Sequence, residues 1–244
     1  SITADTADAD PATDGVQVIE GHPVSIRLTD LQEDVQIKSL ELLVNGVVVQ
    51  TVTSYPYELL ANAPLLASGA TTMAIQVRAT DTGGNVGLSN VVVVDVVADT
   101  FAPAATNVSL VDGDNRFALR SVELVFDETI DTDRLDAAKV TLLRAGADGQ
   151  FGTDDDVLTP VALDVRRRGM ALTIIVPGTL PAGSYRLAID RTMIADRAGN
   201  ELAADIVRTF TIRSASDVKP ESGFAAEPTA PAANAGQEIA LGQN

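Results

Sequence analysis

The sequence predicts an all-β protein built of two consecutive antiparallel β-sandwiches with Greek-key connections, flanked by flexible ends that are acidic or rich in proline and alanine. Two observations lead to this fold class. Short runs of alternating apolar and polar residues recur along the chain, as in strands with one buried face. The motif D-x-x-G-N also occurs twice, at residues 81–85 (DTGGN) and 196–200 (DRAGN), each time between β-type runs. The separation of the two copies matches the length of one small β-sandwich.

The first predicted sandwich covers residues 16–102, after a linker at residues 1–15 that is small and acidic in composition. Apolar side chains alternate with polar ones at residues 24–29, 73–80 and 92–96, which indicates half-buried strands.

Asn45 and Gly46 lie between two apolar runs and predict a tight hairpin. Both residue types tolerate the positive φ angles that a two-residue type I′ turn requires. The first sandwich is expected to end in residues 98–103 (ADTFAP). Pro103 cannot donate to a β-ladder and stiffens the connection that follows.

The second predicted sandwich covers residues 103–213 and repeats the alternating pattern at residues 122–126, 172–176, 185–189 and 210–212.

Three segments of this half depart from the strand pattern. Residues 132–139 predict a helical turn, and residues 144–156 predict an acidic loop. Residues 214–244 are rich in alanine and proline and predict a linker or the start of a further module. The last part of this tail, residues 238–242 (EIALG), could begin that module or add a strand to a sheet.

Charge and composition exclude several classes of function. The formal net charge of −17 repels phosphate backbones and anionic membrane surfaces, so we expect no nucleic-acid partner and no binding to anionic membranes. No apolar stretch approaches the roughly 18 residues of a membrane span, so we expect no membrane insertion. The absence of cysteine excludes disulfides and thiolate metal sites. The chain begins at Ser1 without a basic-then-apolar leader, and we interpret it as a piece of a longer protein.

Several motifs of the first half resemble the bacterial Ig-like domains that are strung along secreted and cell-surface proteins. They are residues 20–21 (EG), 44–46 (VNG), 55–57 (YPY), 79–85 (ATDTGGN), 89–90 (SN) and 99–103 (DTFAP). The second half is similar to the Ig-like domain of surface-layer and adhesin proteins. Its matching motifs are residues 125–131 (VFDETID), 180–185 (LPAGSY) and 194–200 (IADRAGN). It departs from that family by the insertion-like residues 144–156.

The resemblance implies two Ig-like folds with a passive role in spacing, display or adhesion, outside the cell or on its surface. It implies no catalytic residue. Such a segment would contact neighbouring domains of a longer chain and a protein or cell-surface partner. Three alternatives stay open: an accessory segment of a secreted multidomain enzyme, a glycan- or protein-binding module, and a subunit of a surface assembly that uses strand addition.

The best candidate for a binding site is the acidic loop, in which residues 148–156 read DGQFGTDDD. Closely spaced carboxylates on a glycine-containing loop can surround calcium with oxygen atoms. The candidate calcium ligands are Asp148, Asp154, Asp155 and Asp156. The spacing is not that of an EF-hand, and a solvated acidic loop is the alternative.

The other polar motifs predict surface turns. In the D-x-x-G-N motifs, Asp can accept hydrogen bonds from the amides that follow, while Gly and Asn take left-handed conformations. Residues 112–115 (DGDN) predict a turn, and the acidic cluster in residues 30–34 (DLQED) predicts a solvated loop. Residues 166–168 (RRR) predict a solvated hairpin tip. His22 is the only histidine and is expected to be an exposed turn residue, which leaves Ser-His-Asp catalysis without support. We therefore expect no enzymatic activity.

Overall fold

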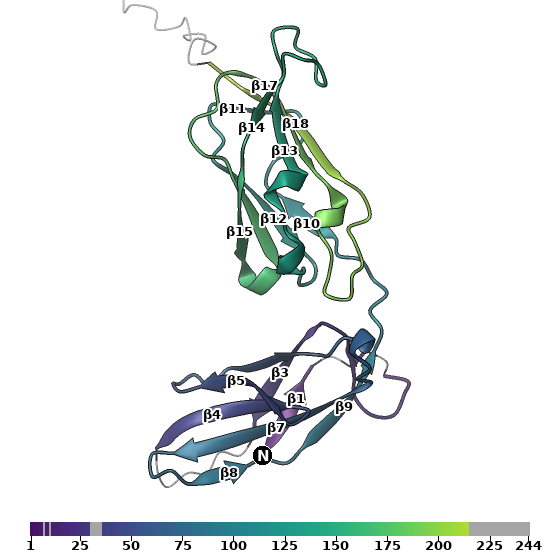
Figure 1. Ribbon diagram of the computed structural model, residues 1–244, viewed down its shortest axis with the longest axis vertical. Helices are drawn as coiled ribbons and strands as arrows, with labels where there is room; N and C mark the ends of the chain where they lie inside the picture. The colour runs from purple at the N-terminus through teal and green to yellow at the C-terminus, as the bar shows by residue number, and fades with distance from the viewer. Residues whose placement is uncertain (7, 10, 30–35, 215–244) are drawn as a thin grey trace, which may run out of the picture.

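The computed structural model describes residues 1–6, 8–9, 11–29 and 36–214, and it confirms the all-β fold class (Figure 1). Two β-sandwiches follow one another along the chain. Within the described residues, no helix is long and apolar enough to cross a membrane.

Two segments for which the sequence predicts a structure lie outside the described residues. They are the acidic cluster in residues 30–34 and the segment 215–244, which includes residues 238–242.

Residues 2–97 form the sandwich that we call the first module. One of its sheets has the strand order β1-β3-β6, and the other has the order β2-β9-β7-β4-β5 with β8 paired to β7. The elements are β1 (Ile2–Asp5), β2 (Gln17–Ile19), β3 (Pro23–Leu28), β4 (Ile37–Val44), β5 (Val47–Val52), β6 (Leu59–Asn62), η1 (Leu66–Ser68), β7 (Thr72–Asp81), β8 (Val86–Leu88) and β9 (Val92–Val97).

Residues 105–212 form the second module. Its sheets have the strand orders β10-β12-β16-β15 and β11-β18-β17-β13-β14. The elements are β10 (Ala105–Val108), β11 (Asp114–Arg116), β12 (Ser121–Phe126), η2 (Thr132–Arg134), η3 (Ala137–Lys139), β13 (Val140–Arg144), β14 (Val157–Thr159), β15 (Ala162–Arg166), η4 (Arg167–Gly169), β16 (Ala171–Ile175), β17 (Gly183–Ile189), η5 (Arg191–Met193) and β18 (Ile206–Ile212).

Most neighbouring strands are antiparallel, as the sequence predicted, but each module also contains one parallel pair. The short strand β2 runs parallel to β9, and the short strand β11 runs parallel to β18. Parallel neighbours need a long crossover connection, and each of these pairs joins an early strand to the last strand of its module. The predicted antiparallel sandwiches are therefore confirmed, with one short parallel strand added at an edge of each module.

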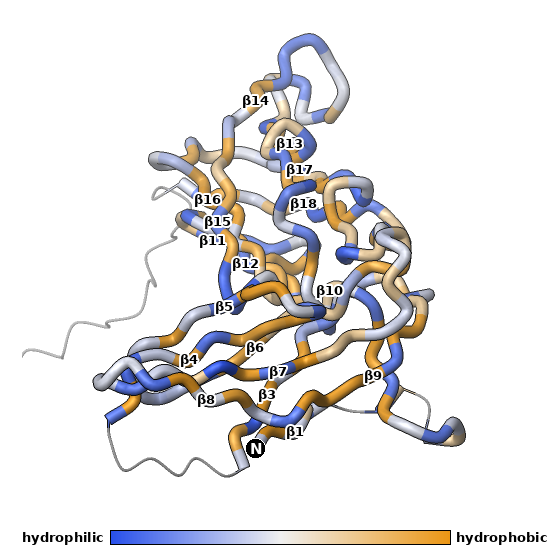
Figure 2. Tube along the Cα trace, turned by 60° about the horizontal axis from the view of Figure 1, so that its bottom comes forward, coloured by the Kyte–Doolittle hydropathy of each residue, from blue (hydrophilic) through white to orange (hydrophobic). Residues whose placement is uncertain are grey.

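Each module closes around its own hydrophobic cluster. In the first module, Leu40 of β4 and Met73 and Ile75 of β7 are completely buried. In the second module, Tyr185 of β17 is buried and stacks on Phe210 of β18, with 5.2 Å between the ring centroids. Hydrophobic and hydrophilic residues alternate along the strands, as the periodicity predicted (Figure 2).

The predicted hairpin at Asn45 and Gly46 is confirmed between β4 and β5. Asn45 has a φ of 50° and Gly46 a φ of 78°, so both take the left-handed conformation of a type I′ turn. The side-chain oxygen of Asn45 also accepts a hydrogen bond from the amide of Ala74 at 2.9 Å. The helical turn predicted for residues 132–139 is confirmed by η2 and η3.

The two D-x-x-G-N turns have the same hydrogen-bond geometry. Asp81 accepts from the backbone and side-chain amides of Asn85 at 2.8 and 2.7 Å. Asp196 accepts from the same two groups of Asn200 at 2.9 and 2.7 Å. The role predicted for Asp is confirmed, but the left-handed conformation expected of Asn was wrong. In these turns only Gly84 and Gly199 have positive φ, and each Asn instead holds the Asp carboxylate with its side chain.

Replacing Asn85 with alanine is expected to lower the melting temperature of the first module by a few degrees near neutral pH. The side-chain amide of Asn85, which alanine removes, is the main group that holds the pKa of Asp81 below its ordinary value of 3.8, and the backbone amide, which alanine keeps, acts in the same direction. Because this pKa is lowered on folding, the stability it contributes is present above that value and is lost as the pH falls below it. Thermal melts from pH 7 to about pH 3 should therefore show the difference between the variant and the parent chain narrowing on acidification. A difference that stays constant over this range would contradict the assignment.

The prediction of a linker at residues 1–15 was partly wrong, because Ile2–Asp5 form the strand β1, which pairs with β3. Ile2 is only 2% exposed and packs in the cluster of the first module. Its amide donates to the side chain of Asn90 at 2.9 Å. A single apolar residue among small acidic ones gives no visible alternation, so composition alone indicated a linker.

Candidate functional site at the module junction

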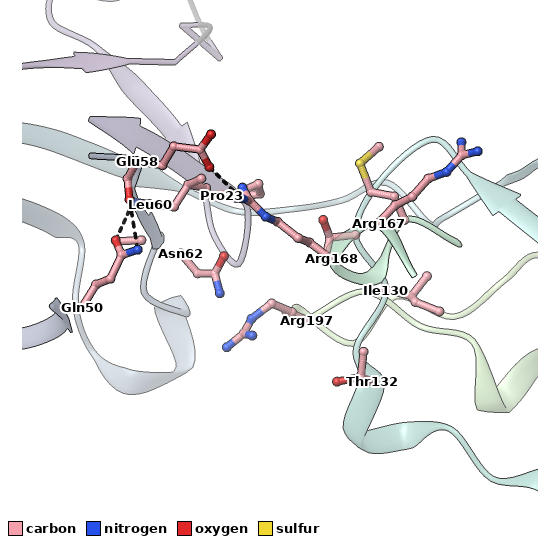
Figure 3. Close-up of a pocket in the computed structure, with 13 residues that line it drawn as sticks. Pro23, Gln50, Glu58, Leu60, Asn62, Ile130, Thr132, Arg167, Arg168 and Arg197 are labelled. Atoms are coloured by element: carbon pink, nitrogen blue, oxygen red, sulfur yellow. Dashed lines mark hydrogen bonds and ion pairs between the residues drawn. The ribbon is translucent and has the colours of Figure 1, made fainter. Parts of the chain in front are cut away.

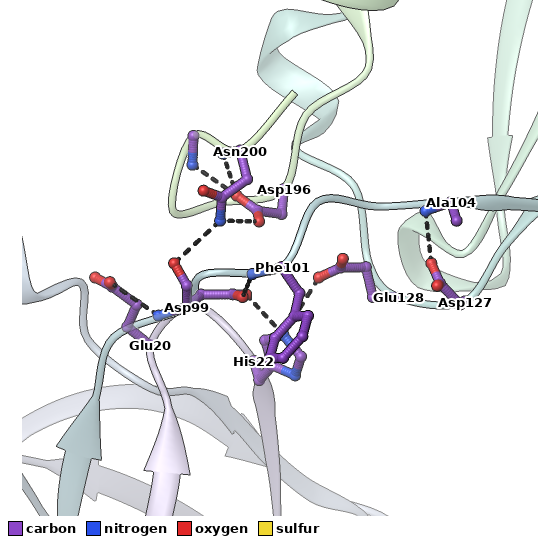
Figure 4. A network of polar contacts seen from close by, with 10 residues as sticks. Glu20, His22, Asp99, Phe101, Ala104, Asp127, Glu128, Asp196 and Asn200 are labelled. Atoms are coloured by element: carbon purple, nitrogen blue, oxygen red, sulfur yellow. Dashed lines mark hydrogen bonds and ion pairs between the residues drawn. The ribbon is translucent and has the colours of Figure 1, made fainter. Parts of the chain in front are cut away.

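The connection between the modules is tied to both of them (Figure 4). The Asp99 amide donates to the carboxylate of Glu20 in the first module at 3.3 Å. Asp99 Oδ1 accepts from the amide of Phe101 at 3.0 Å, which closes a turn in the connection. The Ala104 amide then donates to the carboxylate of Asp127 in the second module at 2.8 Å. The part of the connection between these two anchors is therefore short.

The second D-x-x-G-N turn packs directly against the first module. The side-chain amide of Asn200 donates to the backbone oxygen of Asp99 at 3.1 Å, in addition to holding Asp196. Gly21 has a φ of 74°, and a Cβ atom there would lie 2.9 Å from the Cβ of Arg197. Only glycine fits this close approach without displacing the turn. The turn that closes the second module thus also forms part of the junction.

His22, Asp99 and Glu128 meet at the centre of the junction. His22 Nε2 lies 3.0 Å from Asp99 Oδ2 and 3.3 Å from Glu128 Oε2. His22 precedes β3 in the first module, Asp99 lies in the connection, and Glu128 follows β12 in the second module. The side chain of Asp99 is 2% exposed and that of Glu128 is 12% exposed. The expectation that His22 is merely an exposed turn residue was wrong, because its ring contacts carboxylates from two other segments.

The junction holds more negative charge than its cationic groups balance. Burial raises the pKa of Glu128 to about 7, and the negative charges of Asp99 and Asp196 act in the same direction, while His22 opposes them. In the part of the chain that the structure describes, no lysine or arginine forms an ion pair with any of these three carboxylates. A carboxyl group with a raised pKa at a contact between segments marks a candidate functional site.

Asp196 adds negative charge to the junction, but both of its carboxylate oxygens accept hydrogen bonds within its own turn. Its Oδ1 accepts from the amides of Gly199 and Asn200, and its Oδ2 accepts from the side chain of Asn200. The carboxylate therefore adds negative charge beside Glu128 while its own oxygens serve the turn.

The second module matches a protein family. Residues 99–212, which begin with the junction residue Asp99, match the family model described as a bacterial Ig-like domain. Residues 99–212 form a bacterial Ig-like domain. The family predicted for the second module is thus confirmed. The first module lies outside the matched residues, and its own resemblance stays a prediction. No curated protein matches the chain.

Solved structures similar to this chain share little sequence with it. PcoC, a methionine-rich copper resistance protein from Escherichia coli, has 17% identity and a TM-score of 0.36, over 46% of this chain and 100% of PcoC. Domains 1–6 of the surface layer protein SbsC have 18% identity and a TM-score of 0.32, over 46% of this chain and 14% of that chain. The fibronectin(III)-like modules of CbhA from Clostridium thermocellum have 13% identity and a TM-score of 0.31, over 88% of this chain and 96% of theirs.

A cleft of about 550 Å³ lies between the first module and the Ig-like domain, beside the junction (Figure 3). Arg167, Arg168 and Arg197 reach it from the Ig-like domain, and Glu58 reaches it from the first module. Arg168 pairs with Glu58 at 3.0 Å, so the arginine-rich tip predicted to be a solvated turn also contacts the other module. Both side chains are mostly exposed, at 71% and 64%, and such a pair adds little stability.

The acidic loop of the Ig-like domain lies at its far end from the first module, between β13 and β14 (Figure 1). Asp155 Oδ2 accepts from the amide of Ala147 at 2.6 Å, and Asp156 Oδ2 accepts from the amide of Gly152 at 2.6 Å. The hydroxyl of Thr153 lowers the pKa of Asp155 by donating to its carboxylate.

The four predicted calcium ligands do not meet around one point. Asp148 accepts from the amide of Gln150 at 2.9 Å, and Asp154 lies beside Asp155 on the exposed part of the loop. Among the described residues, the only group of three or more candidate metal ligands that meet within 4.8 Å is His22, Asp99 and Glu128. Calcium binding by Asp148, Asp154, Asp155 and Asp156 stays a prediction.

Proposed function

We propose that this chain is a spacer and display segment of a larger bacterial protein at the cell surface or outside the cell. In this proposal the two modules hold their neighbours at a fixed distance and orientation. The bacterial Ig-like family of the second module supports a structural or adhesion-type role. The segment acts through the stability of its folds rather than through turnover of a substrate.

The observation that carries this proposal is the set of contacts that fix Asp99 between the modules. Its backbone amide is bound by Glu20, and its backbone oxygen is bound by Asn200 from the Ig-like domain. Its carboxylate contacts His22, which in turn contacts Glu128. A connection held from both sides in this way favours one relative orientation of the modules, whereas a free linker would allow many.

The chain path also suits a spacer. In the Ig-like domain, Ile189 pairs with Ile206 at the end near the junction. Gly183 pairs with Ile212 at the opposite end, where β18 finishes. The polypeptide therefore enters the domain at one end and leaves it at the other, so that further domains would continue in line. The partners expected from this arrangement are neighbouring domains of the parent chain and surface molecules that those domains present.

The distance distribution between the two modules tests the proposal. The chain contains no cysteine, so Val47→Cys in β5 and Leu158→Cys in β14 would place two spin labels at exposed positions, one on each module. We expect a narrow distribution by pulsed electron paramagnetic resonance. Asn200→Ala should broaden it, because this change removes the bond to Asp99.

Asn85→Ala is the matched control for Asn200→Ala. It removes the same side-chain bond, from the Asn amide to the Asp carboxylate, within the equivalent turn of the first module. Within the described residues, Asn85 makes no hydrogen bond or ion pair across the junction. The control should therefore leave the distribution narrow. A broad distribution in the parent chain would overturn the proposal of a fixed spacer.

A further inference from the structure

We propose that His22, Asp99 and Glu128 form a binding site for one divalent transition-metal ion of the zinc type, and that the bound ion joins the two modules. This inference deepens the proposed function, because it names a ligand for the same junction. The site itself depends only on the three side chains and does not require that the modules act as a spacer.

The geometry of the three side chains fits such an ion. The ligand atoms His22 Nε2, Asp99 Oδ2 and Glu128 Oε2 lie within 4.8 Å of one another, with 3.0 and 3.3 Å from the nitrogen to the two oxygens. Zinc bonds of about 2.0–2.2 Å in a tetrahedral arrangement place neighbouring ligand atoms roughly 3.3 Å apart. Two of the three ligand separations already have this size, so binding requires only a small movement of Glu128 or Asp99.

The donor set selects the class of metal. Calcium and magnesium prefer all-oxygen sites, whereas imidazole with carboxylates suits zinc and related transition metals. Cysteine is absent from the chain, so a softer thiolate site cannot compete. Three protein ligands leave one tetrahedral position for water, which corresponds to an accessible site rather than a closed structural one. The 38% exposure of the His22 side chain provides the path of entry.

A cation satisfies this cluster better than hydrogen bonds alone can. His22 Nε2 carries at most one hydrogen, yet it faces two carboxylate oxygens. Within the described residues, Asp99 Oδ2 and Glu128 Oε2 have no other hydrogen-bond or ion-pair partner. The acidic loop is different, because Asp155 and Asp156 bind backbone amides of their own loop there.

The surrounding contacts orient the ligands before any metal binds. Asp99 Oδ1 is held by the amide of Phe101, which leaves Oδ2 directed at His22. The backbone on either side of this carboxylate is fixed by Glu20 and Asn200. Such outer contacts hold metal ligands in their binding orientation and commonly affect affinity about 10–100-fold.

Isothermal titration calorimetry of the full chain with Zn²⁺ tests the site. We expect one Zn²⁺ per chain, with affinity reduced by more than tenfold in His22→Ala and in Glu128→Gln. Titration with Co²⁺ should give the visible absorption of a four- or five-coordinate ion, and both variants should lose it. These two positions are preferred to Asp99, because Asp99 is almost completely buried and its replacement could prevent folding.

The double variant Asp154→Asn/Asp156→Asn is the matched control, because it removes two carboxylates from the acidic loop and leaves the junction intact. It should bind Zn²⁺ like the parent chain. Absence of saturable 1:1 binding in the parent chain, or unchanged binding in both His22→Ala and Glu128→Gln, would overturn the metal site. The spin-label distances measured in EDTA report on the spacer separately. If the distance distribution is narrow and the chain binds no Zn²⁺, only the metal site is refuted. If the distribution in EDTA is broad and the chain binds Zn²⁺, only the proposal that the modules keep a fixed orientation without metal is refuted.

Discussion

Replacing Leu40 with alanine is expected to lower the free energy of unfolding of the first module by about 2–5 kcal/mol and to leave the second module unchanged. Leu40 is completely buried in β4, where it pairs with Val52 of β5 and Ala79 of β7. Alanine leaves a cavity that the surrounding strands fill only in part. The hydrophobic clusters of the two modules share no residue, so the loss should stay within the first module.

Scanning calorimetry with hydrogen exchange to assign each transition measures this effect. Lys38→Ala provides a control on the same strand, because Lys38 points to solvent and should change the stability little. A variant in which both transitions move down by the same amount would show that the modules unfold as one unit. That result would contradict the separate cores.

Replacing Tyr185 with alanine is expected to destabilise the second module by about 3–5 kcal/mol, since a large buried ring is removed. Tyr185 is completely buried and stacks on Phe210, and its hydroxyl donates to the backbone oxygen of Pro181 at 2.8 Å. Tyr185→Phe keeps the ring and removes only this hydrogen bond. Pro181 is exposed, so its carbonyl can bind water instead, and the expected loss is about 0.5–1.5 kcal/mol.

Urea unfolding of the two variants separates the ring from the hydroxyl. A large loss in Tyr185→Ala with a small one in Tyr185→Phe is expected. Equal losses in the two variants would mean that the hydroxyl bond, rather than the packing of the ring, stabilises this end of β17.

Local patterns predicted much of the fold. The Asn45-Gly46 hairpin depends on two adjacent residues, and the alternation along β7 depends on neighbours two positions apart. Both signals can be seen in a single sequence. Strand β1 escaped prediction because its pairing with β3 depends on backbone hydrogen bonds, which composition does not reveal.

The candidate site could not be predicted in the same way. His22 and Asp99 are 77 positions apart, and Glu128 belongs to the other module, so no local pattern connects them. The sequence directed attention to the acidic loop, where several carboxylates are adjacent. In the structure, Asp155 and Asp156 bind amides of their own loop. The nearest signal in the sequence was the single histidine close to the start of the first module, together with the acidic connection that follows the last strand of that module.

The parallel pairing of β11 with β18 determines how the Ig-like domain would respond to tension. Asp114, Asn115 and Arg116 pair in register with Phe210, Thr211 and Ile212. The chain enters and leaves at opposite ends, so a pulling force runs along these strands and loads their hydrogen bonds in shear. Bonds loaded in shear must break together, whereas bonds at a peeled edge break one after another. A protein built from such domains would therefore resist stretching more strongly than the marginal free energy of unfolding typical of globular domains suggests.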